Sequence, residues 1–513
     1  MENSNISSIL DLNIETYGEY DYLIYLGYEG EKILTNREIL VRARRFSVGL
    51  QKIGVKRGDI VGSVLSNVLE IIEIINGINR MGATYLPIIY MLTAAEIRYI
   101  LKDSGCKVIL TEANLLPKVL EAAKGLPSVE RIVLIGEGEG DNIVPYESLL
   151  TEDDGRGDAV DVDPDREIAV LMYTSGTTGF PKGVLLSHRT FRFQFTSGQM
   201  VWGGKVGGRV LTTVPMNHIY GVLSITEGNK GGGVCVVMQP FDPRRVLDVI
   251  RDYKANYVSV VPTMLIYLLM VHKPEIDDLS SLVLLICSGG PLAMETLNQA
   301  QRAFKMEITQ GYGCTEVGGS ITRQRLDRPR KPGSVGAALP GIALKIVDFQ
   351  GKALPPGEEG EIVCRGDCLM NGYLNKPQET ASAIIDGWLH TGDLGRLDED
   401  GDLFITGRLK DLIIKGGENI DPGVAEGWLY KHPAIWECAV IAIPDPKYHE
   451  EVAAAVTLKP GMKATEEELL AYLGEHLHPF VAPKKIFIFD ALPKTGLGKI
   501  LKREIRRIVH EQI

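Results

Sequence analysis

The chain lacks any long uninterrupted run of apolar residues. No apolar stretch reaches the roughly 18 residues that a membrane-spanning helix needs. The sequence Met1-Glu-Asn-Ser-Asn has an acidic residue where a secretory signal carries lysine or arginine. We therefore expect no transmembrane segment and a protein that stays in the cytoplasm.

Cysteine is sparse and scattered, with seven residues in a chain of 513. The number is odd, and most of the cysteines stand in apolar surroundings. This usage is typical of reduced thiols in a core rather than of a disulfide framework. Cys364 and Cys368 lack the spacing and the partner ligands of a zinc site, so we interpret them as structural.

Basic residues are outnumbered, with 55 Lys and Arg against 66 Asp and Glu, which gives a net charge of −11. Such a balance argues against wholesale nucleic-acid binding, so no nucleic-acid partner is expected. Residues 494–507 are locally basic. We interpret this run as a terminal amphipathic helix with a solvated charged face; attraction for a nucleotide phosphate is the weaker interpretation.

No internal repeat or low-complexity tract is present, and the length allows two to four globular domains. Beyond about residue 325, strands broken by Gly and Pro turns predict a distorted β-barrel, and residues 409 to the end predict a compact α+β segment. Before about residue 325, strand-like runs alternate with helical segments, which predicts an α/β fold. Examples of these runs are Ile60–Leu65, Lys107–Thr111, Arg131–Ile135 and Ser281–Ile286.

The segment Tyr173-Thr-Ser-Gly-Thr-Thr-Gly-Phe-Pro-Lys-Gly-Val184 has the composition of a polyphosphate-binding loop. Its glycines expose backbone N–H groups, its hydroxyl side chains donate hydrogen bonds, and Lys182 adds a cation. The apolar run Ile168–Met172 precedes it and predicts a buried strand, so the loop should leave a sheet edge where nucleotides commonly bind. The alternative is an ordinary turn rich in small polar residues.

This loop is not a Walker A loop. That pattern requires Gly-x4-Gly-Lys-Ser/Thr, whereas here Pro181 stands five residues after Gly176 and Gly183 follows Lys182. The kinase and P-loop NTPase interpretations therefore lose their main support.

Together with an ordered set of further motifs, the loop resembles the adenylate-forming superfamily, which includes AMP-forming acyl-CoA synthetases, aryl-CoA ligases, stand-alone adenylation domains and firefly luciferase. The resemblance spans nearly the whole chain. The motifs are Pro215–Gly221, Val261–Thr263, Ser288–Pro291, Gly311–Glu316, Trp388–Asp393, Gly407–Asp411, Gly416–Asn419 and Pro493–Lys499.

The resemblance implies a multidomain α/β architecture. Residues 1–408 would form the N-terminal adenylation domain, with two α/β sheets plus a distorted β-barrel, and residues 409–513 a small mobile α+β domain with its hinge at Lys410. ATP, Mg²⁺ and coenzyme A would be the cofactors, and a small carboxylic acid the substrate. The sequence is also compatible with a homodimer.

The implied chemistry is activation of the acid as acyl-AMP, with release of pyrophosphate, and then transfer to CoA. The β- and γ-phosphates of ATP would be held by Thr174, Ser175, Gly176, Thr177, Thr178, Gly179 and Lys182. Other implied cofactor-binding residues are Gly289, Gly290, Pro291, Gly311 and Gly313.

The resemblance also assigns roles to single side chains. Tyr312 would stack on adenine, Thr315 would donate to the α-phosphate, and Glu316 would bind Mg²⁺. Asp393 would accept the ribose hydroxyls, and Arg408 would reach ribose or phosphate. Taken alone, each of these residues has an ordinary structural alternative, such as a core aromatic, a helix-terminal acid or a surface ion pair.

Three further roles concern the two half-reactions. Lys499, delivered by docking of the C-terminal domain, would stabilise charge during adenylation. Rotation at Lys410 would then bring Gly416 and Gly417 to the active site as a close-packed surface for the pantetheine arm. His218 would act in positioning or gating beside the acyl pocket rather than as a general base; its alternative is a core histidine.

Some positions depart from the family pattern and concern CoA docking or the acyl pocket. They are Asp421, Val424, His449-Glu450, Val481 and the glycine-rich stretch Thr226–Gly233, which argues against a long fatty-acyl tunnel. We therefore expect a small to medium aliphatic, alicyclic or aromatic acid, bound near His218, Tyr220, Val222, Thr263, Gly289 and Gly313.

Three alternatives stay open at this point. The acyl group could pass to a carrier-protein phosphopantetheine instead of CoA, because both acceptors present the same arm. A luciferase-type oxygenase has the fold as its only support. A catalytically silent nucleotide or acyl binder is disfavoured by the retention of Lys182, Glu316, Asp393, Arg408 and Lys499.

Overall fold

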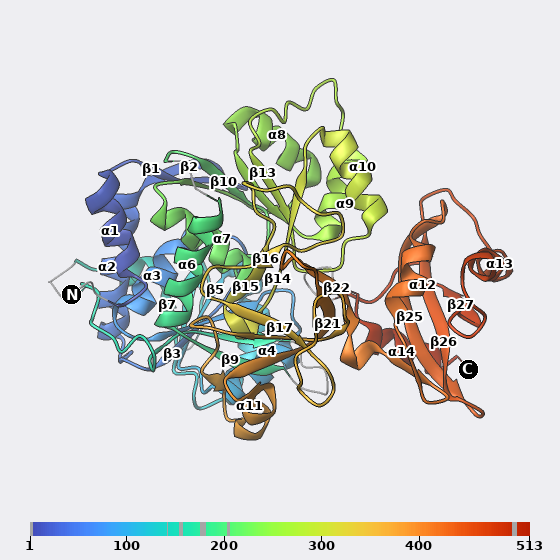
Figure 1. Cartoon of the computed structure of the whole chain (residues 1–513). Helices are drawn as coiled ribbons and strands as arrows, with labels where there is room; N and C mark the ends of the chain where they lie inside the picture. Colours follow the sequence, from blue (N-terminus) through green and yellow to red (C-terminus); the bar gives the residue numbers. More distant parts are fainter. Residues whose placement is uncertain are drawn as a thin grey trace.

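The computed structural model describes residues 4–140, 142–152, 157–174, 181–202, 206–494 and 500–512. Two large mixed sheets and a smaller antiparallel sheet make up the part before residue 409, and two small sheets with three helices follow it (Figure 1). The α/β multidomain class expected from the sequence is confirmed.

The first large sheet has the order β19-β9-β8-β4-β3-β5-β6-β7. Strands β3 to β8 run parallel, and β9 and β19 add antiparallel to one edge. The bounds are β3 (Ile60–Leu65), β4 (Thr84–Ile89), β5 (Val108–Glu112), β6 (Arg131–Ile135), β7 (Ile143–Pro145), β8 (Ile168–Thr174), β9 (Lys182–Ser187) and β19 (Gly372–Tyr373).

The second large sheet has the order β16-β15-β14-β13-β12-β10-β11-β1-β2. Its central strands are parallel, and both ends are antiparallel. The bounds are β1 (Asp21–Gly27), β2 (Gly30–Thr35), β10 (Arg209–Thr212), β11 (Val234–Met238), β12 (Tyr257–Val260), β13 (Leu284–Cys287), β14 (Ile308–Cys314), β15 (Gly319–Arg323) and β16 (Ala337–Ala338).

Helices cover these sheets, and one of them is buried along its whole length. Helix α3 presents Ile71, Ile72, Ile74, Ile75 and Ile78 to a core cluster that draws on both large sheets. The helices of this region are α1 (Ser8–Tyr17), α2 (Asn36–Lys52), α3 (Ile71–Arg80), α4 (Ala94–Ser104), α5 (Leu116–Ala123), α6 (His188–Trp202), α7 (Ile219–Lys230), α8 (Pro243–Tyr253), α9 (Pro262–Val271), α10 (Met294–Phe304) and α11 (Pro377–Ala383), with the 3₁₀ turns η1 (Ala113–Leu115), η2 (Tyr146–Leu149), η3 (Thr315–Val317) and η4 (Leu409–Asp411).

The third sheet is a half-barrel of short antiparallel strands that lies against β14 to β16 (Figure 1). Its strands are β17 (Ala343–Val347), β18 (Gly360–Arg365), β20 (Ile384–Ile385), β21 (Trp388–Leu397) and β22 (Leu403–Arg408). The distorted β-barrel expected beyond about residue 325 corresponds to this sheet.

The last hundred residues have apolar clusters of their own on both faces of one sheet. Figure 1 shows this part, in orange and red, at one end of the molecule. Its elements are β23 (Ile413–Lys415), β24 (Glu418–Ile420), α12 (Pro422–Leu429), β25 (Ile435–Asp445), β26 (His449–Leu458), α13 (Glu466–His476), β27 (Lys485–Ile488) and α14 (Lys502–His510).

Some element boundaries differ from the sequence prediction. The terminal helix begins at Lys502, because Lys494 and Ile500 form an antiparallel β-bridge before it and the N–H of Leu501 donates to the carbonyl of Pro493. The strand expected at Ser281–Ile286 begins at Leu284, where the parallel ladder to β12 starts.

The structure agrees with two other expectations. All seven cysteines are free; six are buried and Cys314 is half-buried. Burial raises the pKa of the Cys235 thiol to about 11, so it stays protonated and unreactive near neutral pH. Among the described residues, no helix is long and apolar enough to cross a membrane.

Candidate active site

Several of the predicted site residues follow the carboxyl ends of neighbouring parallel strands in the second large sheet. Val261–Thr263 follows β12, Ser288–Pro291 follows β13, and Tyr312 and Glu316 lie at the end of β14 and in η3. The carboxyl ends of parallel strands meet at one edge of a sheet, which is where α/β proteins bind ligands. The fold therefore gathers motifs that are far apart in the sequence.

Tyr312, Asp393 and Arg408 are in direct contact. The Tyr312 hydroxyl donates to Asp393 Oδ2 at 2.7 Å, and Arg408 Nε lies 2.8 Å from Asp393 Oδ1. Asp393 and Arg408 face each other in the β21–β22 ladder, whereas Tyr312 comes from the second large sheet. Burial, and then the charge of Asp393, raise the pKa of Tyr312, so its hydroxyl remains a donor.

The part of strand β21 that carries Asp393 is held by Glu361, which the sequence analysis did not single out. Glu361 Oε2 lies 2.7 Å from His390 Nδ1, and Oε1 accepts the N–H of Gly392 at 3.0 Å. The Thr391 hydroxyl donates to the carbonyl of Ile362 at 2.7 Å. This part of β21 is thus fixed before any ligand binds, and Glu361 lies on the neighbouring strand of the β18–β21 ladder.

Glu316 contacts a tyrosine that the sequence analysis also missed. The Tyr373 hydroxyl donates to Glu316 Oε1 at 3.0 Å, and Lys182 Nζ lies 4.9 Å from the centre of the Tyr373 ring. Lys182 and Glu316, predicted to act on the phosphates and the metal, therefore share one aromatic neighbour. Thr315, the first residue of η3, is buried.

The chemistry of Glu316 fits the predicted magnesium ion. Mg²⁺ is usually bound by one or two carboxylates together with substrate phosphates, rather than by a cage of protein ligands. The described residues contain no cluster of three or more metal-ligating side chains. A single half-buried carboxylate beside a phosphate loop is therefore a suitable donor set for a metal that arrives with ATP.

The strands on both sides of the predicted phosphate loop pair with each other, with Thr174 opposite Lys182. The Tyr173 hydroxyl donates to Asp103 Oδ2 at 2.6 Å, and the Tyr99 hydroxyl donates to the carbonyl of Pro181 at 3.2 Å. These bonds anchor both ends of the loop. Several predicted residues lie outside the described residues, namely Ser175, Gly176, Thr177, Thr178, Gly179 and Lys499.

His218 caps helix α7, because its Nδ1 accepts the N–H of Tyr220 at 3.2 Å. In a neutral imidazole this leaves the proton on Nε2, so the side chain presents a donor rather than a base. That geometry favours the predicted positioning role over general-base catalysis. Gly221 is required next to this cap, since a Cβ there would lie 2.1 Å from the carbonyl oxygen of Pro215.

Two asparagines tie the segment before His218 to the first large sheet. Asn217 Nδ2 donates to the carbonyls of Leu65 and Ile88 at 3.0 and 3.2 Å. Asn67 Oδ1 accepts the N–H of Met216 at 2.9 Å. The sequence prediction gave no function to either asparagine, because the partner carbonyls come from strands far away in the chain.

The predicted glycines differ in what the structure explains. A Cβ at Gly313 would lie 1.8 Å from the carbonyl oxygen of Gly319, and a Cβ at Gly311 would lie 3.1 Å from that of Thr322. Close packing of β15 thus accounts for both glycines, and their contact with a nucleotide stays a prediction. Gly289, Gly290 and Pro291 are exposed after β13.

The predicted CoA-facing glycines form the turn between β23 and β24. Gly416 and Gly417 have φ values of 58° and 92°, which favour glycine, and both are exposed. The N–H of Gly416 donates to the carbonyl of Tyr448 at 3.1 Å. The predicted hinge, Lys410, lies in η4 directly after β22; desolvation, and then the charge of Arg408, lower its pKa.

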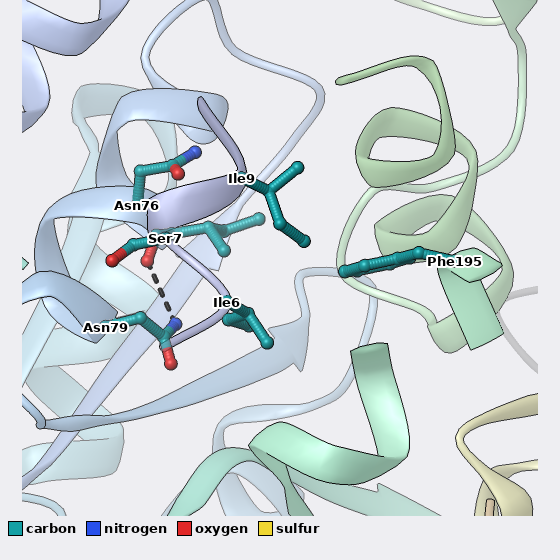
Figure 2. A pocket seen from close by; sticks show the side chains of 7 residues that line it. Ile6, Ser7, Ile9, Asn76, Asn79 and Phe195 are labelled. Carbon is teal, nitrogen blue, oxygen red and sulfur yellow. Dashed lines mark hydrogen bonds between the residues drawn. The ribbon is translucent and has the colours of Figure 1, made fainter. Parts of the chain in front are cut away.

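Two cavities lie beside helix α1, and neither is lined by the residues described above. One of about 10 Å³ is lined by side chains of the N-terminal segment, α3 and α6, and Phe195 faces Ile6 and Ile9 across it (Figure 2). A neighbouring groove of about 380 Å³ contains the ion pair between Arg80 and Asp11. Neither includes a predicted site residue, so we assign the acyl pocket to neither.

Comparison with known proteins agrees with this arrangement. The family described as AMP-binding enzyme matches residues 10–374, and the AMP-binding enzyme C-terminal domain matches residues 425–499. A long-chain-fatty-acid–CoA ligase of Bacillus subtilis (strain 168) is 32% identical over 98% of this chain and 94% of its own. A feruloyl-CoA synthase of Amycolatopsis sp is 34% identical over 93% and 94%. The fatty acid–[acyl-carrier-protein] ligase ScoC of Streptomyces coeruleorubidus is 33% identical over 93% and 91%.

Two crystal structures of MatB from Rhodopseudomonas palustris also cover 99% of both chains, at 27–28% identity. The TM-score is 0.90 for the ATP-bound form and 0.78 for the apo form. Since both forms have the same fold, the arrangement of the parts in the present structure resembles that of the ATP-bound form. From the matched family and these relatives, the chain belongs to the AMP-binding enzyme family and is an AMP-forming acyl-CoA ligase.

Proposed function

We propose that this ligase activates a small to medium aliphatic, alicyclic or aromatic acid, and that the residues predicted from the sequence perform the steps described below. The observation that carries the proposal is the joining of Tyr312 to Asp393 and Arg408 across two sheets. An aromatic ring can stack on a nucleotide base, a neighbouring carboxylate can accept the ribose hydroxyls, and a guanidinium can bind ribose or phosphate.

In the first half-reaction, an oxygen of the substrate carboxylate attacks the α-phosphorus of ATP, and the bond to pyrophosphate breaks. Lys182 and the loop before it would hold the departing phosphates, and Thr315 would donate to the α-phosphate. Glu316 would hold Mg²⁺, which when bound neutralises charge on the phosphates. Lys499 would add a second cation between the carboxylate and the α-phosphate.

In the second half-reaction, the CoA thiol attacks the acyl carbonyl, its proton passes to solvent, and AMP leaves with the electrons of the broken bond. A thiol is acidic enough to ionise without an obligatory side-chain base. We propose that the part from residue 409 onward turns about Lys410 between the two steps, so that Gly416 and Gly417 approach the pantetheine arm. His218 would position the acyl group.

The proposed acid is shorter than the long-chain substrate in the name of the Bacillus subtilis relative. The sequence Thr226-Glu-Gly-Asn-Lys-Gly-Gly-Gly233 supports this, since it is too polar and glycine-rich for an apolar tunnel. A relative of similar identity, the feruloyl-CoA synthase, has an aromatic acid in its name. We also propose the cytoplasm as the site of action, because it supplies ATP and CoA. We further propose a homodimer, which the molar mass from light scattering would test.

The test is pyrophosphate release with ATP, Mg²⁺ and CoA across acetate, butyrate, hexanoate, decanoate, palmitate, benzoate and cyclohexane carboxylate, with controls that omit CoA. A CoA-dependent maximum on a short, medium or aromatic acid is expected. A maximum on palmitate would overturn the proposed substrate class. Adenylate formation without CoA consumption would favour the second candidate function, transfer to a carrier protein. The name of the relative ScoC, a fatty acid–[acyl-carrier-protein] ligase, supports this candidate.

A further inference from the structure

A short strap connects the edge of the first large sheet to Glu316. Residues 370–374 run antiparallel to β9 and bring β19 to the edge of that sheet. Asn371 N–H donates to the carbonyl of Leu185, and Leu374 N–H to that of Gly183, both at 2.8 Å. Met370 N–H donates to the carbonyl of Glu316, also at 2.8 Å. The strap therefore fixes η3 relative to β9, the strand that begins at Lys182.

Tyr373, in the middle of this strap, contacts both predicted phosphate-site side chains. Its hydroxyl donates to Glu316 Oε1 at 3.0 Å, and its ring lies 4.9 Å from Lys182 Nζ. Its own backbone N–H donates to the Thr380 hydroxyl at 2.8 Å, which fixes the backbone from the other side. Neither contact is a local one: 57 residues separate Tyr373 from Glu316.

The hydroxyl of Tyr373 acts as a donor to Glu316, because the carboxylate oxygen Oε1, 3.0 Å away, can only accept a hydrogen bond. A donor that occupies Oε1 selects one rotamer of the carboxylate and leaves Oε2 as the oxygen open to a ligand. The face of the same ring lies 4.9 Å from the Lys182 ammonium, which it attracts as a cation–π partner.

We propose that Tyr373 is a positioning residue, which orients Glu316 and Lys182 for the magnesium complex of ATP. The inference rests on the proposed roles of these two residues. Outer partners that orient a metal-ligating carboxylate typically change metal affinity or activity about 10- to 100-fold when they are removed. Tyr373 would act through Glu316 and not through contact with the substrate.

The simplest alternative is that Tyr373 only fills space, and Tyr373→Phe separates the two roles. Phenylalanine keeps the ring, the packing and the contact with Lys182, but it removes the hydroxyl. We expect this variant to need about 10-fold more Mg²⁺ for half-maximal pyrophosphate exchange. ATP binding by calorimetry should weaken by a similar factor with Mg²⁺ and change little in EDTA. Tyr430→Phe is the matched control, because it removes a buried hydroxyl whose partner, the carbonyl of Cys438, lies in the last part of the chain.

Glu316→Gln and the double variant complete the experiment. If Tyr373 acts through Glu316, the double variant should show the magnesium requirement of Glu316→Gln alone. An unchanged magnesium requirement in Tyr373→Phe, with a shifted one in Glu316→Gln, would overturn the role of Tyr373 and leave the proposed function intact. An unchanged requirement in Glu316→Gln would overturn both. Additive shifts would also contradict the inference, since they would mean that Tyr373 acts independently.

Discussion

Lys415 and Glu451 form a buried ion pair directly beneath the turn of Gly416 and Gly417. The distance from Nζ to Oε1 is 2.5 Å, and the lysine side chain is only 2% exposed. The ammonium group also donates to the carbonyl of Phe480 at 3.0 Å and lies 4.7 Å from the centre of the Phe480 ring. At the preceding residue, the N–H of Ile414 donates to Glu450 Oε2 at 2.7 Å. The glycine turn is therefore fixed to the β25–β26 hairpin.

Lys415→Met should slow thioester formation more than adenylation. The change leaves Glu451 as a buried charge without its partner, which typically destabilises by about 3–5 kcal/mol. Single-turnover transfer from supplied acyl-AMP to CoA, compared with pyrophosphate exchange, checks the prediction. Lys431→Met is the control, since Lys431 stacks at 3.7 Å on Trp428 in the same part of the chain but is exposed. Equal loss of both half-reactions, with the fold retained, would contradict it.

Lys499→Ala should abolish acyl-AMP formation and leave the transfer of supplied acyl-AMP to CoA largely intact. The physical reason is that a cation between the carboxylate and the α-phosphate is needed only while charge develops there. Measuring the two half-reactions separately is the check, with Lys494→Ala as a nearby control whose side chain is paired with Glu437 at 2.6 Å. A variant that fails equally in both steps would show that our division of roles is wrong.

Tyr312→Phe should raise the KM for ATP and also lower the free energy of unfolding. The lost hydroxyl bonds to the carboxylate of Asp393, and hydrogen bonds to charged groups contribute about 1.5–3 kcal/mol. This corresponds to an increase of roughly 10-fold or more if the bond orients Asp393 for ribose. Arg408→Lys tests the other side, because it keeps the charge and loses the Nε contact. Normal ATP kinetics in both variants would exclude this arrangement as the nucleotide site.

Gly313→Ala should destabilise the sheet edge and impair adenylation. An added Cβ would lie 1.8 Å from the Gly319 carbonyl oxygen, so β14 and β15 must move apart and displace Tyr312. Gly427→Ala is a helical control with no atom within 4 Å of the new Cβ, and it should stabilise by up to about 1 kcal/mol. Urea unfolding and pyrophosphate exchange measure the two effects. Wild-type stability in Gly313→Ala would contradict the packing explanation.

His188 should make the protein less stable as the pH is lowered from about 6.5 to 4. Burial lowers the pKa of His188 from 6.5 to about 4. Between these values the unfolded state binds more protons than the folded state, so the free energy of unfolding falls as the pH falls. Above pH 6.5 the histidine is neutral in both states and contributes nothing to the pH dependence. The full effect is on the order of 3 kcal/mol.

His188→Asn isolates this contribution, because an asparagine oxygen can replace Nδ1 as the acceptor of the Ile6 N–H. Glu70, whose pKa burial raises to about 6, acts in the opposite direction, since the folded state binds its proton more tightly. Only the difference between wild type and variant is therefore informative. We expect the wild type to lose about 2 kcal/mol relative to the variant between pH 7 and pH 5. Parallel pH curves would contradict the assignment.

The sequence alone determined the local elements and the family. Strands Ile60–Leu65 and Arg131–Ile135 were predicted to the residue, because a short apolar run bounded by turn residues specifies a buried strand within its own length. The motifs of residues 173–184, 311–316 and 388–393 identified an adenylate-forming enzyme before any contact was known. One boundary that was predicted wrongly, the start of α14, depends on a β-bridge that no local pattern encodes.

Only the tertiary structure decided which side chains support the predicted site. Four supporting residues have partners in other elements, at separations that a sequence pattern does not measure: Tyr373, Glu361, Asn217 and Lys415. Periodicity reports burial and turn chemistry reports local backbone, because both arise from neighbours within a few residues. A hydroxyl placed 3.0 Å from one carboxylate oxygen results instead from the packing of three sheets, and that packing brings the strap of Tyr373 to Glu316.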